Sequence, residues 1–344
     1  MSSRTGLKRV GDQRLSLRLA ALCGPTTTLI ELTANHPSRL ARKALDKSFA
    51  LVGAHRGSDV VTRDLVLDGP GGTISARLFE PAGIGPDAGL MVYFHGGGFV
   101  LGSLDSHSNS CRFIAAQANC RVLSVEYRQP PEAAFPAAFD DALAAYRWAV
   151  AHASELGADP RRIAVGGDSA GGNLAAAVAL ALTEDDVPPC FAWLVYPVVD
   201  GDLEAYPSAR SFADGPLLSG RAAQMMLAHY VPDERDRTDP RFSVLDAPNL
   251  SQMPPTYIAT AGMDPLRDQA ERFAERLQAT GVETELRRFD QLPHGFELLL
   301  VDPDARNATA ETCAALARGL NRPLASAPVS ADQPTINDER LSVR

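Results

Sequence analysis

The sequence predicts an α/β protein with a mostly parallel central sheet. Over most of the chain, extended apolar runs alternate with segments whose apolar residues recur at helical spacing. Such alternation implies βαβ crossovers, which join parallel strands. The chain has 344 residues, 45% of them hydrophobic, so it is long and apolar enough for one large domain or two ordinary ones.

The first part of the chain is expected to be helical with breaks, followed by a β-hairpin. Residues 1–55 carry apolar residues at helical spacing in "RLSLRLAALCG" and "SRLARKALDKSFALVG". No long apolar stretch precedes a small-residue cleavage site, so no signal peptide is predicted. The segments "VTRDLVLDG" and "GTISARLFEP" then alternate apolar and polar residues around a glycine-rich turn, which is typical of a hairpin.

Strands and helices alternate after this hairpin. Strands are expected in "GLMVYFH", "CRVLSVEY", "RIAVGGD" and "FAWLVYPVV", with helices near 106–118, 138–154 and 169–182. The pattern resumes with "TYIATAG", a helix near 265–279, "TELRRFD" and a last helix near 303–318. Residues 200–250 interrupt it, with one helical piece, "SGRAAQMMLAHYV". An insertion there is expected above the carboxyl edge of the sheet, where open α/β sheets bind ligands.

Charge and cysteine usage exclude several function classes. A net charge of −9 counts against a nucleic-acid or anionic-membrane partner. No apolar run reaches the ~18 residues of a membrane span. The cysteines form no CxxC or Cys/His cluster, so neither a metal site nor a disulfide framework is predicted. Free thiols suit a reducing compartment, so a cytoplasmic location is expected. No motif in the sequence implies a cofactor. The five cysteines are Cys23, Cys111, Cys120, Cys190 and Cys313.

A candidate nucleophile lies where a predicted strand meets a predicted helix. Gly167-Asp168-Ser169-Ala170-Gly171 matches the G-x-S-x-G nucleophile elbow, which needs this strand–turn–helix context. The small neighbours let the chain turn sharply and let a substrate reach the Ser169 hydroxyl. The alternative is a helix N-cap serine that bonds its own backbone and does no chemistry.

The candidates for activating Ser169 lie much later in the chain and are an aspartate and a histidine. Asp264 in "AGMDPLRD" and His294 in "QLPHGF" each follow a predicted strand, at the same sheet edge as the elbow. The histidine would relay the serine proton, and the aspartate would hold its tautomer. Asp264 is also suited to an Asx turn or an N-cap. Its rival is Asp268, one turn into the next helix, and the rival base is His229 on the inserted helix. His36, His55 and His152 fall outside the sheet-edge loops, and His107 lies near a helix start.

A glycine run is the candidate oxyanion hole. His95-Gly96-Gly97-Gly98 follows the predicted strand "LMVYF", in the loop expected to supply N–H donors to a tetrahedral intermediate. Two of these three glycines are expected to donate; the family resemblance stated in the next paragraph implies Gly97 and Gly98, with Gly96 possible. Ala170, at a helix N-terminus, is the further donor. His95 itself is expected to bond nearby backbone rather than to take part in catalysis.

These motifs together resemble a known family. "HGGG", "GDSAGGNLA", "DPLRD" and "HGF", in this order, look like the hormone-sensitive-lipase-like (bacterial family IV) esterases of the α/β-hydrolase superfamily, over roughly residues 60–320. The resemblance implies the α/β-hydrolase fold, with an eight-stranded sheet, and a triad of Ser169, Asp264 and His294. "VEYRQPPEAAFPAAFDDA" is similar to a structural segment of that family, except that Gln129 and Pro130 stand where Leu-Ala is frequent.

The resemblance further implies a helical cap over the site. The expected division is 1–55 and 200–250 for the cap, 56–199 and 251–324 for the hydrolase core, and 325–344 for a flexible tail. The substrate-binding candidates each have core packing as the alternative role. They are Phe99, Leu218, Met226, Tyr230 and Phe296.

The predicted function is a cofactor-free serine hydrolase that cleaves short- to medium-chain carboxylic esters through an acyl-enzyme. An amide, a carbamate or a lactone would use the same groups. A non-catalytic ligand-binding protein on this scaffold is the competing class, against which His294 and the intact glycine run both count. The expected partner is a small-molecule ester, and the resemblance leaves a homodimer open.

Overall fold

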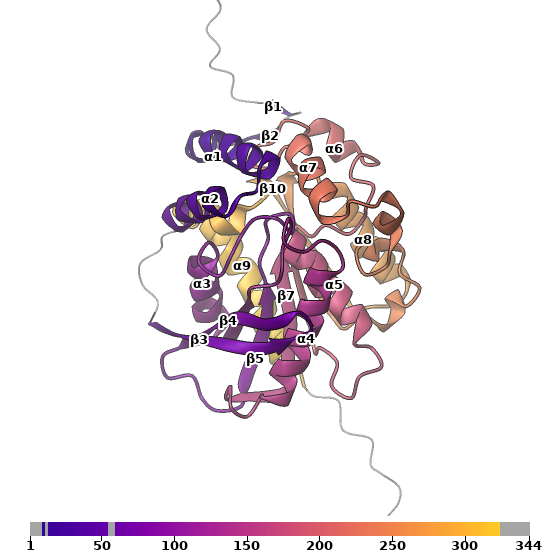
Figure 1. Cartoon of the computed structure of the whole chain (residues 1–344). Coiled ribbons are helices and arrows are strands. Elements are labelled where there is room, and N and C mark those ends of the chain that lie inside the picture. Colours follow the sequence, from indigo (N-terminus) through magenta and orange to yellow (C-terminus); the bar gives the residue numbers. More distant parts are fainter. Residues whose placement is uncertain (1–8, 11–12, 54–58, 324–344) are drawn as a thin grey trace, which may run out of the picture.

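The computed structural model describes residues 9–10, 13–53 and 59–323 (Figure 1). Strands β1 (Arg9–Val10) and β2 (Gln13–Arg14) pair before helix α1 (Leu17–Asn35), where the sequence predicted helix. The helix begins after Ser16, because the Ser16 hydroxyl accepts the Leu19 N–H at 3.2 Å and so caps the first turn. Helix α2 is Arg39–Val52. His55 and the predicted tail 325–344 lie outside the described residues.

The core is an eight-stranded mixed sheet in the order β10-β9-β8-β7-β5-β6-β4-β3. The pairs β3–β4 and β4–β6 are antiparallel and the others parallel, so the predicted mostly parallel sheet carries an antiparallel edge. The predicted hairpin is this edge, with Gly69 opposite Gly72. The strands are β3 (Val60–Gly69), β4 (Gly72–Pro81), β5 (Ala88–Phe94), β6 (Arg121–Val125), β7 (Ala158–Asp168), β8 (Ala192–Val195), β9 (Thr256–Met263) and β10 (Thr284–Pro293).

Helices cover both faces of the sheet (Figure 1). Helices α3 (Ser108–Ala118) and α9 (Pro303–Leu320) contact each other on one face. Helices α4 (Ala137–Ala151), α5 (Ala170–Ala181) and α8 (Arg267–Ala279) lie on the other. Strands β6 and β9 are buried along their whole length, as expected of near-continuous apolar runs covered on both sides.

The insertion between β8 and β9 contains more structure than the sequence predicted. Besides the expected helix α7 (Gly220–Tyr230), it forms α6 (Pro207–Ser211) and the 3-10 helices η1 (Glu234–Thr238) and η2 (Val244–Asp246). Two further 3-10 helices are η3 (Leu250–Gln252) and η4 (Phe296–Leu298). Such one-turn helices have no periodicity long enough to read in a sequence.

Helices from distant parts of the chain meet over one end of the sheet. Helix α1 contacts both α2 and α7, above the sheet in Figure 1. The Thr27 hydroxyl accepts the Leu217 N–H at 3.1 Å, and the Ser219 hydroxyl donates to Glu31 at 2.5 Å. In the described ranges, no helix has both the length and the apolar character needed to cross a bilayer.

Candidate active site

Ser169 stands on a strained turn between β7 and α5. Its φ of 54° and ψ of −117° lie outside the regions that L-residues ordinarily adopt. The serine occupies the N-cap position of α5, yet its side chain makes no capping hydrogen bond. A Cβ on Gly171 would lie 1.8 Å from the Phe94 carbonyl oxygen, so only glycine allows this helix to approach β5. The turn therefore presents the Ser169 hydroxyl away from the helix backbone.

Asp264, His294 and Ser169 form one hydrogen-bonded line. His294 Nε2 lies 2.9 Å from Ser169 Oγ, and His294 Nδ1 lies 2.8 Å from Asp264 Oδ2. The other Asp264 oxygen accepts the Leu266 N–H at 2.8 Å, so the carboxylate forms an Asx turn as well. With Nδ1–H donating to Asp264, Nε2 is free to accept the serine proton. The two roles weighed for Asp264 thus coexist, each on its own oxygen.

The rival residues lie elsewhere. Asp268 accepts the Ser208 N–H at 2.8 Å and pairs with Arg267 at 2.8 Å. His229 is half-buried on α7 and lines neither cavity that holds Ser169. Neither side chain therefore offers Ser169 a base or an acid.

The glycine loop borders the same space as Ser169. Gly97 and Gly98 have φ values of 118° and 60°, which L-residues with side chains seldom adopt, and both line the cavity at Ser169. The Gly96 N–H donates to Asp168 Oδ1 at 2.6 Å, so this third candidate donor is already engaged. Ala170 is the first residue of α5, where a backbone N–H has no carbonyl in the preceding turn. The N–H groups of Gly97, Gly98 and Ala170 remain the candidate donors.

His95 is held in a structural role. Its Nδ1 lies 2.8 Å from the Gly96 carbonyl oxygen, and its ring stacks on Tyr127 with centroids 4.4 Å apart. Burial, together with the nearby His107, lowers the pKa of His95 to about 3. A neutral, stacked imidazole of this kind fixes the start of the glycine loop.

Two small apolar cavities flank Ser169. One of about 60 Å³ lies towards His294, Ile30 and Phe49, and the other, of about 40 Å³, towards Phe99 and Phe242. Ile30 and Phe49 come from α1 and α2, and sequence reasoning missed them because their apolar spacing indicates only a buried helix face. Leu217 and Phe242 lie in irregular segments of the insertion, where no periodicity indicates which side chains face the site.

The substrate-binding candidates divide into two groups. Leu218 and Met226 line both cavities, and Phe99 lines the smaller one. Tyr230 instead stacks behind Phe99, with ring centroids 3.9 Å apart. Phe296 packs edge-on against Tyr196, with centroids 5.1 Å apart, and lines neither cavity, since the turn after His294 directs it into the core.

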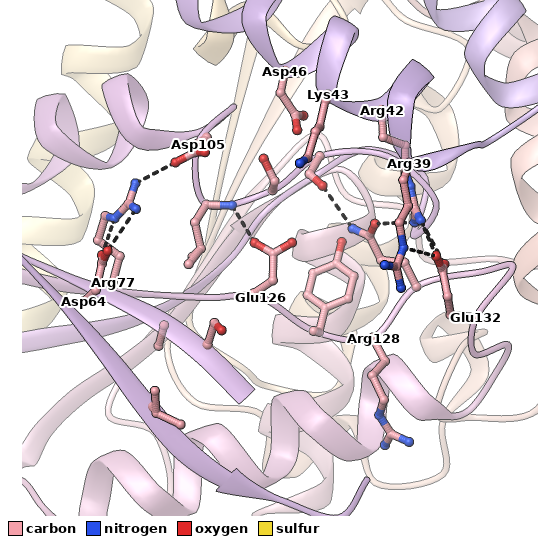
Figure 2. A pocket seen from close by; sticks show the side chains of 18 of the residues that line it. Arg39, Arg42, Lys43, Asp46, Asp64, Arg77, Asp105, Glu126, Arg128 and Glu132 are labelled. Carbon is pink, nitrogen blue, oxygen red and sulfur yellow. Dashed lines mark hydrogen bonds and ion pairs between the residues drawn. The ribbon is translucent and has the colours of Figure 1, made fainter. Parts of the chain in front are cut away.

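A larger cavity of about 800 Å³, with many charged side chains around it, lies beyond the end of the glycine loop, and Ser169, Asp264 and His294 do not line it (Figure 2). Gln129, which departs from the family pattern, lines it and donates to the carbonyl oxygens of Leu101 and Gly102 at 3.1 and 3.2 Å. Its amide oxygen accepts from Arg42 of α2 at 3.3 Å, and Arg42 pairs with Glu132 at 2.7 Å. Gln129 therefore connects α2 to the end of the glycine loop.

Within the described part of the chain, no three His, Cys, Asp or Glu side chains gather as metal ligands. A family model of the α/β-hydrolase fold matches residues 91–298, which contain Ser169, Asp264, His294 and the glycine loop. The chain belongs to the α/β-hydrolase family. The resemblance to the hormone-sensitive-lipase-like esterases, predicted from four motifs, is confirmed.

Curated relatives and solved structures of this α/β hydrolase extend over most of its length. The carboxylic ester hydrolase LipN of Mycobacterium tuberculosis is 43% identical over 267 residues, 75% of this chain and 70% of that protein. An ethyl acetate hydrolase of Pseudomonas putida is 37% identical over 74% of this chain and 82% of that protein. The structure of a Pyrobaculum calidifontis esterase superposes with a TM-score of 0.76 at 33% identity, covering 81% of this chain and 92% of that one.

Proposed function

We propose that this α/β hydrolase cleaves short- to medium-chain carboxylic esters through an acyl-enzyme formed on Ser169. Its enzyme class is carboxylesterase, in agreement with the carboxylic ester hydrolase and the ethyl acetate hydrolase named above. The observation that carries the proposal is the unbroken line from Ser169 Oγ to His294 Nε2 (2.9 Å) and from His294 Nδ1 to Asp264 (2.8 Å). This geometry supplies a base for the nucleophile and a carboxylate to orient the base.

In the proposed acylation step, Ser169 Oγ attacks the ester carbonyl carbon while His294 Nε2 takes its proton. The oxyanion that forms accepts hydrogen bonds from the N–H groups of Gly97, Gly98 and Ala170. His294 then returns the proton to the leaving alcohol oxygen as the carbon–oxygen bond breaks. In deacylation, His294 takes a proton from water, the hydroxide attacks the acyl carbon, and the acid leaves as Ser169 regains its proton.

The size of the cavities supports the short end of the proposed chain-length range. They measure about 60 and 40 Å³, well below the ~150 Å³ of a dry cavity that binds benzene in another protein. A short acyl chain and a small alcohol group can occupy such spaces, and a long chain requires Met226 or the helices above it to move.

We also propose that α1, α2 and residues 200–250 form a cap over the site. Ile30, Phe49 and Leu217 line the cavity of about 60 Å³ from these segments, and Met226 lines both cavities at Ser169. Apolar walls of this kind exclude water from the acyl-enzyme apart from the hydrolytic molecule, and they strengthen the hydrogen bonds to the oxyanion.

Hydrolysis of p-nitrophenyl esters of increasing acyl length, with wild type beside Ser169→Ala, tests the proposal. We expect saturable turnover that declines for long chains and disappears in Ser169→Ala. Ser154→Ala, a change at an exposed serine, is the matched control and should keep wild-type turnover. A fluorophosphonate should label wild type on Ser169 alone. Full turnover in a folded Ser169→Ala variant, or label on another residue, would contradict the proposal.

A further inference from the structure

A second group of polar side chains lies buried beneath the site, and the proposed reaction uses none of them. Tyr93 comes from β5, Asp168 from the end of β7, His107 from the residue before α3, and Glu297 from η4. Each is at most 2% exposed. Four ionisable side chains in one apolar core are costly unless their protons are arranged to satisfy one another.

The hydrogen bonds require one of the two carboxyl groups to carry a proton. Tyr93 Oη lies 2.7 Å from Asp168 Oδ1 and 3.0 Å from Glu297 Oε1. A phenol has a single proton to donate, so it can donate to only one of them. The other contact is a hydrogen bond only if that carboxyl group is protonated and donates to Tyr93 Oη.

The surroundings of the two carboxyl groups decide which one is protonated. Asp168 Oδ1 also accepts the Gly96 N–H at 2.6 Å and lies 3.5 Å from His107 Nε2. These contacts favour negative charge on Asp168. Glu297 Oε2 has no hydrogen-bond partner among the described residues, and a bare carboxylate oxygen in an apolar core is strongly disfavoured.

The remaining groups that face Glu297 do not supply a positive charge. Besides Tyr93 and Asp168, they are the Cys111 thiol of α3, the Cys313 thiol of α9 and the Tyr196 hydroxyl after β8. Burial and the Asp168 charge raise the pKa of Glu297 well above its usual range. Burial opposes ionisation of Asp168 too, but His107 and the hydrogen bonds from Tyr93 and Gly96 outweigh it and lower the pKa of that carboxyl.

We propose that Glu297 is a positioning residue that is protonated at neutral pH, donates to Tyr93, and so keeps the Tyr93 hydroxyl on Asp168. Asp168 in turn holds Gly96, the residue before the Gly97 and Gly98 donors, and it directly precedes Ser169. Loss of the Glu297 proton places a second carboxylate in competition for the Tyr93 proton. The hold on Gly96 then weakens, and the glycine loop loses its fixed place beside the nucleophile.

The first test measures stability and does not depend on catalysis. Glu297→Gln keeps a donor for Tyr93 and cannot ionise. Since unfolded Glu297 releases its proton above pH ~4.3 and folded Glu297 does not, wild type loses stability relative to this variant as the pH rises. We expect the ratio of the folding constants, variant over wild type, to increase about tenfold per pH unit from pH ~5 upwards. A ratio independent of pH would overturn the proposal.

The control for this test is Glu311→Gln, a half-exposed glutamate of α9 that pairs with Arg287 at 2.6 Å. Its ratio is not expected to increase with pH. Infrared difference spectra at neutral pH provide an independent reading. Glu297→Gln should lose the C=O band of a protonated carboxylic acid, and Glu311→Gln should not. Failure of Glu297→Gln to remove such a band would also contradict the protonated state.

The kinetic test rests on the proposed catalytic role of the glycine loop. At neutral pH, Glu297→Gln should keep the kcat of wild type. Glu297→Leu, which cannot donate a hydrogen bond to Tyr93, should lower kcat by about 10-fold with little change in KM. We expect kcat of wild type to decrease at alkaline pH, where Glu297 loses its proton, and this decrease should move to higher pH in Glu297→Gln. An identical pH profile in the two proteins would overturn the positioning role, even with the stability result as expected.

Discussion

Gly97→Ala is expected to abolish most of the catalytic rate, for a reason visible in the backbone. Gly97 has a φ of 118°, and a Cβ there would lie 2.2 Å from the Leu101 carbonyl oxygen and 2.5 Å from its carbon. The contact is with backbone, so no side-chain rotation relieves it. The Val100 and Leu101 N–H groups both donate to the Gly97 carbonyl, at 3.1 and 2.8 Å, so the loop is closed tightly on itself. The loop must therefore shift as a unit to admit a methyl group.

The expected size of the effect has two parts. An unfavourable φ costs about 1–3 kcal/mol of stability. Displacement of an oxyanion donor costs on the order of 10²- to 10³-fold in kcat, or about 2.7–4 kcal/mol of transition-state stabilisation. Because the donors act mainly on the developing oxyanion, kcat and kcat/KM should fall together while KM changes little.

Gly72→Ala is the matched control. Gly72 has a φ of 119°, but a Cβ there would meet nothing within 4 Å, and the residue begins β4 directly after the β3–β4 turn. It carries the same backbone penalty without the steric contact. We expect a similar loss of stability in urea unfolding, with kcat on a p-nitrophenyl ester unchanged. If the two variants have equal kcat, the reasoning on the glycine loop is wrong.

Three further predictions follow from named contacts. In Asp264→Asn, the amide oxygen still accepts the Leu266 N–H, and the amide NH₂ then faces His294 Nδ1, so the ring proton moves to Nε2. We expect kcat to fall on the order of 10⁴-fold without loss of fold. A variant that keeps a hundredth of the wild-type rate would argue against the tautomer role. Met226 lines both cavities, so Met226→Ala should join them and admit about two more methylenes, each worth ~0.8 kcal/mol. The ratio of kcat/KM for an octanoyl ester to kcat/KM for a butanoyl ester should therefore increase about 15-fold. An unchanged ratio would place the acyl chain elsewhere. Gln129→Leu removes the donor to two buried carbonyl groups at the end of the glycine loop, as well as the contact with Arg42. The free energy of unfolding measured in urea should decrease by about 1–3 kcal/mol. Full stability would show that Gln129 is dispensable there.

The parts of the site that were predicted depend on short stretches of chain. The elbow at Ser169 follows from glycines at fixed offsets between an apolar strand and an apolar helix, and the hairpin at 60–81 from a two-residue alternation around a glycine turn. Asp264 and His294 were predicted because each follows a strand of the same sheet. Since parallel strands end at one edge, residues after them meet even when they are far apart in the chain.

Other features depend on contacts that no local pattern records. The short β1–β2 pair, which was not predicted, precedes the predicted helical stretch, and the Ser16 cap determines where α1 begins. Phe296 and Tyr230 were expected at the substrate, since aromatic residues near a site suit either a pocket or the core. Their rings turn inward, where Tyr230 stacks on Phe99 and Phe296 packs edge-on against Tyr196.

The sequence by itself therefore determined the fold class, the family and the residues of the proposed relay. These depend on periodicities and motifs that span a few residues, and each short segment can adopt the backbone conformation that its motif needs without contacts from distant parts of the chain. Only the tertiary structure decided the size of the cavities, the bond from Gly96 to Asp168, and the Tyr93 hydroxyl shared between Asp168 and Glu297. Tyr93 and Glu297 are 204 residues apart, and they meet because of the order of strands in the sheet and the packing of η4 beneath it. Hydrogen-bond partners in a packed core are set by that three-dimensional arrangement, which short sequence patterns do not encode.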